Sequence, residues 1–158
     1  MKEKFVGTWR LLSWNQQIDG QETPYFGPNP DGRLVYTAEG RVSAHVSGSD
    51  RPRMGMPPEE ARHLAMNLVK PWKARAGVDG LRAILNYFRS TLSYVAYAGT
   101  YSIDGDEVVH HVEVSLIADW IGTEQRRRFR FEANGDRLVL VAPPEGRNPE
   151  HVLTWARL

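Results

Sequence analysis

The stretch TEQRRRFRFEANGDRLVLV, residues 123–141, decides the fold. Its first half alternates in the two-residue period of a β-strand, with Glu124, Arg126, Arg128 and Arg130 on one face and Thr123, Gln125, Arg127, Phe129 and Phe131 on the other. The first set suits water and the second suits an interior. Asn134-Gly135 is the dipeptide most typical of a two-residue hairpin turn, and it pairs Phe131 with Leu138 and Phe129 with Leu140. The stretch therefore predicts an antiparallel hairpin with an apolar inner face.

Similar short runs, rich in Val, Tyr, Phe, Trp and Thr, occur on both sides of this hairpin. We expect eight strands, at Val6–Gln17, Arg33–Thr37, Arg41–Ser47, Ser93–Ile103, Glu107–Leu116, Thr123–Glu132, Arg137–Val141 and His151–Arg157. In an up-and-down meander, the short turns at Ala38–Gly40, Asp104–Asp106 and Asn134–Gly135 all fall at one end, and every long connection falls at the other. This sorting is typical of a closed antiparallel barrel with a plain base and an elaborated mouth, and about eight strands leave room for one small ligand.

Residues 57–92 interrupt the strands with helical signals. Pro57 to Glu60 read as a helix start, because proline suits the first turn and carboxylates suit the positive end of the helix dipole. Apolar residues then recur at helical spacing up to Leu92, and Pro71 separates two helices. We expect a two-helix insert that caps the open end of the barrel, with Leu85 and Phe88 contacting a ligand.

Length and composition limit the classes of function. The 158 residues suit one domain spanning the whole chain, and the net charge of +1 gives no field that favours nucleic acid or a membrane surface. There is no cysteine, no histidine pair at the helical spacing of a zinc site, and no phosphate or dinucleotide motif, so we expect no metal and no cofactor. The chain has no apolar run long enough to span a bilayer and no apolar leader, which predicts a soluble, cytoplasmic protein.

Several stretches resemble a known family. Gly7-Thr8-Trp9, together with Arg157 in the last strand, looks like the Gly-x-Trp signature of lipocalins, in which a terminal arginine packs across the tryptophan. The rest of the chain is similar to the lipocalin-like domain family of bacteria and fungi, a calycin-type barrel, over residues 7–14, 32–37, 97–101 and 109–125. The resemblance implies a barrel whose relatives serve as carriers or as isomerases and cyclases without redox chemistry, some of them beside natural-product pathways.

A polar cluster is expected inside the upper barrel. A hairpin closing across Ile117–Ile121 places Ser115 opposite Thr123, Glu113 opposite Gln125, and His111 opposite Arg127. We expect Glu113 and Arg127 to pair, because either charge buried alone is costly. The preceding strands add Tyr97, Tyr101 and Tyr36, although a shift of one residue in the neighbouring hairpin would present Ala98 and Thr100 instead of Tyr97 and Tyr101.

Two functions from different classes fit this cluster. The first is a carrier or sensor for a small hydrophobic molecule with a polar end, using as ligand-binding residues Tyr36, Tyr101, Ser115, Thr123, Gln125, Phe129, Leu85 and Phe88. The second is a cofactor-independent isomerase, cyclase or lyase, in which His111 and Glu113 move protons, Arg127 holds an oxygen and Tyr97 donates a proton. A purely structural network and a ligand-free interaction domain are the alternatives. Trp14, which shares the outward parity of Thr8, and Trp120 suggest either contact with the insert or a homodimer patch.

Overall fold

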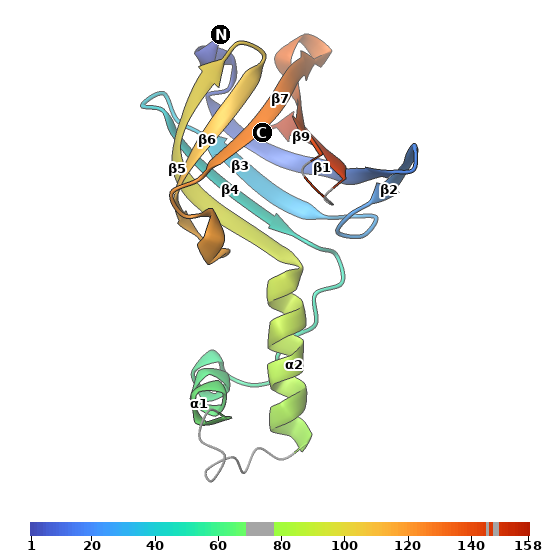
Figure 1. The fold of residues 1–158 in the computed structure, drawn as a ribbon, viewed down its shortest axis with the longest axis vertical. Coiled ribbons are helices and arrows are strands. Elements are labelled where there is room, and N and C mark those ends of the chain that lie inside the picture. The colour runs from blue at the N-terminus through green and yellow to red at the C-terminus, as the bar shows by residue number, and fades with distance from the viewer. Residues whose placement is uncertain (69–77, 145, 147–148) are drawn as a thin grey trace. The chain divides into compact units, whose positions relative to one another are not determined.

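The computed structural model describes residues 1–68, 78–144, 146 and 149–158, and they form two compact units. Residues Met1–Ser49 and Val95–Leu158 make the first unit, which is a β-barrel (Figure 1). Residues Asp50–Tyr94 make the second unit, which holds two helices.

The first unit is a closed antiparallel barrel of eight strands with one strand added. The strands are β1 (Gly7–Ile18), β2 (Gln21–Pro24), β3 (Asp31–Tyr36), β4 (Arg41–Ser47), β5 (Tyr94–Asp104), β6 (Glu107–Ser115), β7 (Glu124–Glu132), β8 (Arg137–Ala142) and β9 (Glu150–Arg157). Around the barrel the order is β1-β3-β4-β5-β6-β7-β8-β9, and β9 pairs with β1 to close it (Figure 1). The predicted eight-stranded up-and-down barrel is confirmed, including the pairing of Phe131 with Leu138 and of Phe129 with Leu140.

The added strand, β2, lies within a connection predicted to be a loop. Asp19 and Gly20 have φ angles of 51° and 75°, and two successive positive angles are those of a type I′ hairpin turn. The turn folds Gln21–Pro24 back onto the end of β1. The long connection after β1 therefore begins with a short hairpin.

Aromatic and basic side chains close one end of the barrel. Phe5, which follows a short 3₁₀ turn at Lys2–Lys4, is fully buried and packs edge-on against Phe129 and Phe131, with ring centroids 4.8 and 5.0 Å away. The Arg157 guanidinium lies 4.2 Å from the ring centroid of Trp9. The predicted packing of Arg157 across Trp9 is thus confirmed, a contact worth about 0.5–2 kcal/mol.

A β-bulge in β1 changes which of its side chains face inward. Leu11 pairs with Trp155 but Ser13 pairs with Thr154, so Leu12 is an extra residue. Beyond it, Trp14 pairs with Leu153 and packs partly buried against Tyr25, 4.8 Å between ring centroids. The predicted outward position of Trp14 is therefore wrong, because the alternation that links it to Thr8 is broken at Leu12.

The second unit contains α1 (Pro58–Leu68) and α2 (Val78–Leu92), which agrees with two helices predicted within residues 57–92. The expected break at Pro71 lies outside the described residues. On α2, Leu85 and Phe88 are 53% and 60% exposed, and their contact with a ligand stays a prediction. Neither helix, over its described residues, has the length and apolar character needed to cross a membrane.

Candidate functional site

A chain of three polar side chains is buried inside the barrel. His110, on β6, is 1% exposed, and its Nε2 lies 2.7 Å from the hydroxyl of Tyr36 on β3. Its Nδ1 lies 2.7 Å from the hydroxyl of Tyr97 on β5. The strand register fixes the position of His110 in the barrel, because His110 is paired with Tyr101 on β5 and with Gln125 on β7.

Burial fixes the protonation state of all three groups. It lowers the pKa of His110 to about 3, and the nearby positive charges of Arg127 and His111 act in the same direction. Burial also raises the pKa of Tyr36 and of Tyr97, against the opposing charge of Arg127. At neutral pH, His110 is therefore a neutral imidazole that lies between two protonated tyrosines.

His111 and Glu113 lie on the outer face of β6, so their predicted inward position is wrong. In the observed register His110 pairs with Gln125 and His111 with Glu124. The predicted turn at Ile117–Ile121 is too short, because the link between β6 and β7 is a wider loop with a 3₁₀ turn at Ala118–Trp120. The observed register differs from the predicted one by an odd number of residues, which exchanges the two faces of the strand.

A second β-bulge explains why Ser115 nevertheless lies on the predicted face. Gly99 pairs with Val112, whereas Ala98 pairs with Val114, so Glu113 is an extra residue on β6. At Gly99 a Cβ would overlap the carbonyl oxygen of His111, so this close approach of two backbones requires glycine. Beyond the bulge the alternation is reversed, and Ser115 pairs with Tyr97.

On the outer face, His111 and Glu113 have other partners. The Nε2 of His111 lies 2.9 Å from the Ser102 hydroxyl, and its Nδ1 lies 3.4 Å from a carboxylate oxygen of Glu124. Glu113 accepts two hydrogen bonds from the Arg41 guanidinium, at 3.0 and 2.7 Å. The expected pair of Glu113 with Arg127 does not form.

Arg127 faces the interior, as predicted, because it is paired with Val108, which belongs to the core and shares the inner face of β6 with His110. It is partly buried and donates hydrogen bonds to the Gln125 side-chain oxygen at 3.1 Å and to the Arg126 carbonyl oxygen at 2.8 Å. With none of the residues that the structure describes does it form an ion pair. The pKa of His151 on β9 is lowered by the burial of that histidine and, to a smaller extent, by the charge of Arg127.

The other predicted ligand-binding residues divide into three groups. Tyr101 and Phe129 belong to the aromatic base: both rings pack against Phe5, and the Tyr101 hydroxyl donates to the Thr37 carbonyl at 3.3 Å. Ser115 and Thr123 hydrogen-bond nearby backbone, and Thr123 is exposed. Tyr36 and Gln125 form the third group and lie in a polar part of the interior together with Tyr97, His110 and Arg127.

His110 and His151 are the interior residues that sequence reasoning missed. The signal for His110 was present, because Val108, His110 and Val112 form a more apolar alternating set than Val109, His111 and Glu113. His151 accepts a hydrogen bond from the Trp14 indole at 3.1 Å. Its inward position follows from the unbroken alternation of β9, in which His151, Leu153 and Trp155 share one face.

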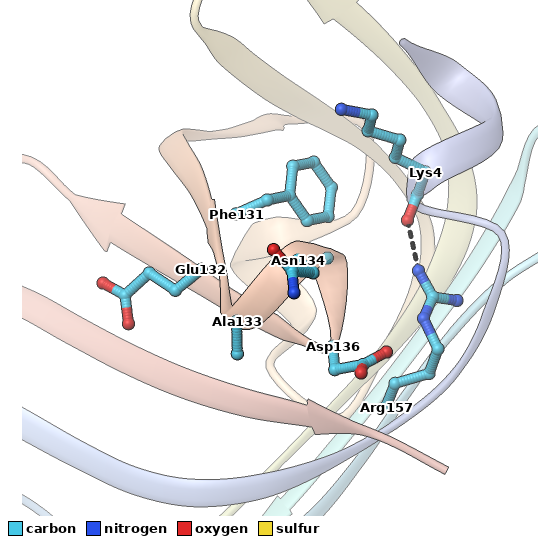
Figure 2. Close-up of a pocket in the computed structure, with 8 residues that line it drawn as sticks. Lys4, Phe131, Glu132, Ala133, Asn134, Asp136 and Arg157 are labelled. Carbon is cyan, nitrogen blue, oxygen red and sulfur yellow. Dashed lines mark hydrogen bonds between the residues drawn. The ribbon is translucent and has the colours of Figure 1, made fainter.

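A pocket of about 540 Å³ lies at the closed end of the barrel, lined by the Ala133–Gly135 turn, Lys4, Phe131, Glu132, Asp136 and Arg157 (Figure 2). Arg157 already donates to the carbonyl oxygens of Lys4 and Val6, at 2.7 and 2.9 Å. Its guanidinium is therefore occupied by the backbone, and the other polar lining residues are Lys4, Glu132, Asn134 and Asp136.

A closed antiparallel barrel with a polar cluster inside an apolar wall defines a lipocalin-type architecture. The family model described as a lipocalin-like domain matches residues 6–158, and the chain belongs to that family. No curated protein matches.

Among solved structures, a redesigned beta barrel is 9% identical, with 99% of this chain and 94% of that chain covered and a TM-score of 0.46. An uncharacterized protein from Bacteroides eggerthii is 13% identical, with 95% and 98% covered and a TM-score of 0.42. The fluorescent protein UnaG is 12% identical, with both chains fully covered and a TM-score of 0.37.

Proposed function

We propose that this barrel is a carrier or sensor that binds a small, mostly apolar molecule with one polar end. The observation that carries the proposal is the Tyr36–His110–Tyr97 chain, buried in an interior lined mostly by aromatic and aliphatic side chains. A hydrogen-bonded polar chain is not needed to fill a core, because apolar side chains of the same shape can be about as stable there. A few polar groups that converge within an apolar wall are typical of a ligand site.

Three further interior groups bear on the binding of a ligand. Gln125 and Arg127 face inward but remain partly exposed, so solvent reaches part of each residue. The Trp155 indole nitrogen is buried and has no hydrogen-bond partner among the described residues. An acceptor atom of a bound molecule would satisfy it, and such an unsatisfied donor otherwise costs about 1–3 kcal/mol.

A cofactor-independent isomerase, cyclase or lyase is the second candidate, favoured by the continuous Tyr–His–Tyr chain, which could relay a proton. Acid–base turnover needs a base with a pKa near the working pH. The pKa of His110 is about 3 and both of its nitrogens are engaged, while His111 and Glu113 lie on the outer face. Binding is therefore the better-supported function.

The test uses isothermal titration calorimetry and thermal unfolding with decanoic acid, 1-decanol and 2-naphthol. At least one should bind and raise the free energy of unfolding, by about 2.7 kcal/mol at a hundredfold excess over its Kd. Gln125→Trp, which fills the interior, should abolish binding. Glu124→Trp, on the outer face of the same strand, should preserve it. Equal loss in the two variants, or no binding by the unsubstituted protein, would contradict the proposal.

A further inference from the structure

The three buried side chains have one hydroxyl proton more than the hydrogen bonds between them require. Tyr36, Tyr97 and a neutral His110 together carry three protons on oxygen or nitrogen, and the two hydrogen bonds between them consume two. The third proton belongs to whichever tyrosine accepts the imidazole N–H. The position of the N–H on His110 therefore decides which tyrosine can donate to another molecule.

The surroundings of Tyr36 favour one of the two arrangements. Tyr36 is 1% exposed, its ring packs edge-on against Phe5 and Tyr101, and its hydroxyl has no second partner among the described residues. An unused proton there would be a buried donor without an acceptor, which is unfavourable. Tyr36 should therefore donate to Nε2, and His110 should carry its proton on Nδ1 and donate it to the Tyr97 oxygen.

Tyr97 then keeps a hydroxyl proton to donate. Its ring lies 5.9 Å from that of Trp120, in the loop between β6 and β7, and it is 9% exposed. It is therefore nearer than Tyr36 to the loops at the open end of the barrel.

Arg127 brings a positive charge to the same region. A guanidinium has five N–H donors, and the described residues accept hydrogen bonds from two of its nitrogens. The Arg127 guanidinium donates to the side-chain oxygen of Gln125, which is paired with His110, the residue that holds the Tyr97 hydroxyl. An uncompensated cation and a free hydroxyl donor thus face the same part of the interior.

We infer that the polar end of the ligand is an oxygen anion, such as a carboxylate, held by the Arg127 guanidinium and the Tyr97 hydroxyl, with His110 in its Nδ1–H form as the residue that positions Tyr97. This inference rests on the proposed function and names the class of ligand. A neutral carbonyl or alcohol would satisfy Tyr97 but leave the guanidinium charge unbalanced. An anion satisfies both groups, through charge-assisted hydrogen bonds that are stronger than neutral ones.

Calorimetric titration at pH 8 with decanoic acid, methyl decanoate and 1-decanol tests the ligand class. The unsubstituted protein should bind decanoate about 10- to 100-fold more tightly than the other two probes. Arg127→Gln should remove this preference. Arg128→Gln removes the same charge from the outer face, where Arg128 pairs with Glu150, and should keep the preference. Tyr97→Phe should weaken decanoate binding about tenfold.

The outcomes separate the inference from the proposed function. If none of the three probes binds, the proposed function fails with these ligands, and the inference about the ligand class fails as well. If all three bind with equal affinity, or if Arg128→Gln loses the preference as Arg127→Gln does, the inference is overturned and the binding function stands.

Nitrogen-15 NMR of the His110 ring provides a readout that does not depend on affinity. We expect a protonated Nδ1 and a bare Nε2 at neutral pH, in the unsubstituted protein and in Arg127→Gln alike. A protonated Nε2 would overturn the assignment of Tyr97 as the donor.

Discussion

At the scale of single residues, the interior of this barrel is organised by a histidine that does not titrate near neutral pH. Desolvation penalises the imidazolium form of His110, and the nearby Arg127 adds to that penalty. Both ring nitrogens are engaged with tyrosines. His110 therefore acts as a fixed donor and acceptor that holds two hydroxyl groups in place.

This environment predicts a dependence of stability on pH. An unfolded histidine has a pKa near 6.5, so below about pH 6.5 the unfolded chain binds a proton that folded His110, with a pKa of about 3, does not. The unfolded state is thereby favoured, and stability should fall as the pH drops from 6.5 towards 3. Between pH 7 and pH 5 the loss from His110 should be about 2 kcal/mol. Urea unfolding at the two pH values measures it.

His110→Gln should remove this part of the pH dependence, because glutamine does not titrate. His111→Gln, which changes the neighbouring imidazole on the outer face, should retain it. A pH dependence that is unchanged in His110→Gln would contradict the assignment of a neutral, buried His110.

At the scale of the strands, two bulges decide which side chains enter the interior. The extra residue Leu12 turns Trp14 inward, and the extra residue Glu113 returns Ser115 to the face of Tyr97. The second bulge depends on Gly99, which lets β5 lie against the His111 carbonyl. The geometry around His110 is therefore set partly by a residue that has no side chain.

Gly99→Ala should be destabilising, since its Cβ would overlap backbone that cannot move away as a flexible side chain would. We expect a loss of about 1–3 kcal/mol or more in the free energy of unfolding, measured by urea titration. Gly105→Ala makes the same change in an open turn, where φ is 61° and no atom lies within 4 Å of the new Cβ. It should cost only about 1 kcal/mol, for backbone strain alone. Similar losses in the two variants would argue against a tight approach at Gly99.

The strands were predictable from sequence to a greater degree than the faces of those strands. Alternation along residues 124–131 and the Asn134-Gly135 turn are local signals, and both gave the observed pairing. Asp19-Gly20 is an equally local hairpin signal, from which β2 could have been found. The facing of His110 was not predictable from the assumed turn, because the length of the loop after β6 sets its register. Bulges depend on contacts between strands and leave little trace in the composition of a single strand.

At the scale of the whole molecule, the barrel is closed by contacts between the two ends of the chain. β1 pairs with β9 along most of its length, and Arg157 bridges from β9 to the indole of Trp9 and to two backbone carbonyls near Phe5. Phe5 fills the space beneath the aromatic core. A single side chain thus joins the closing strand to the base.

Arg157→Met should therefore destabilise the whole barrel and not only its base. Losing the cation–π contact and two hydrogen bonds should cost about 2–4 kcal/mol. Arg130→Met removes an exposed arginine that pairs with Glu132 on the surface, and should change stability by less than about 1 kcal/mol. Urea unfolding monitored by circular dichroism compares the two, and an equal effect would show that the base contact contributes little.

The antiparallel pairing of β1 with β9 also determines how the barrel would respond to mechanical force. The start of β1 and the end of β9 lie at the same end of the barrel, where the Leu158 amide donates to the Thr8 carbonyl at 2.9 Å. Pulling the two termini apart would load the bonds between these strands one after another, beginning at that pair, as in a zipper. In single-molecule stretching the barrel should therefore open by peeling at low force, with Arg157 and Trp9 among the first contacts to separate.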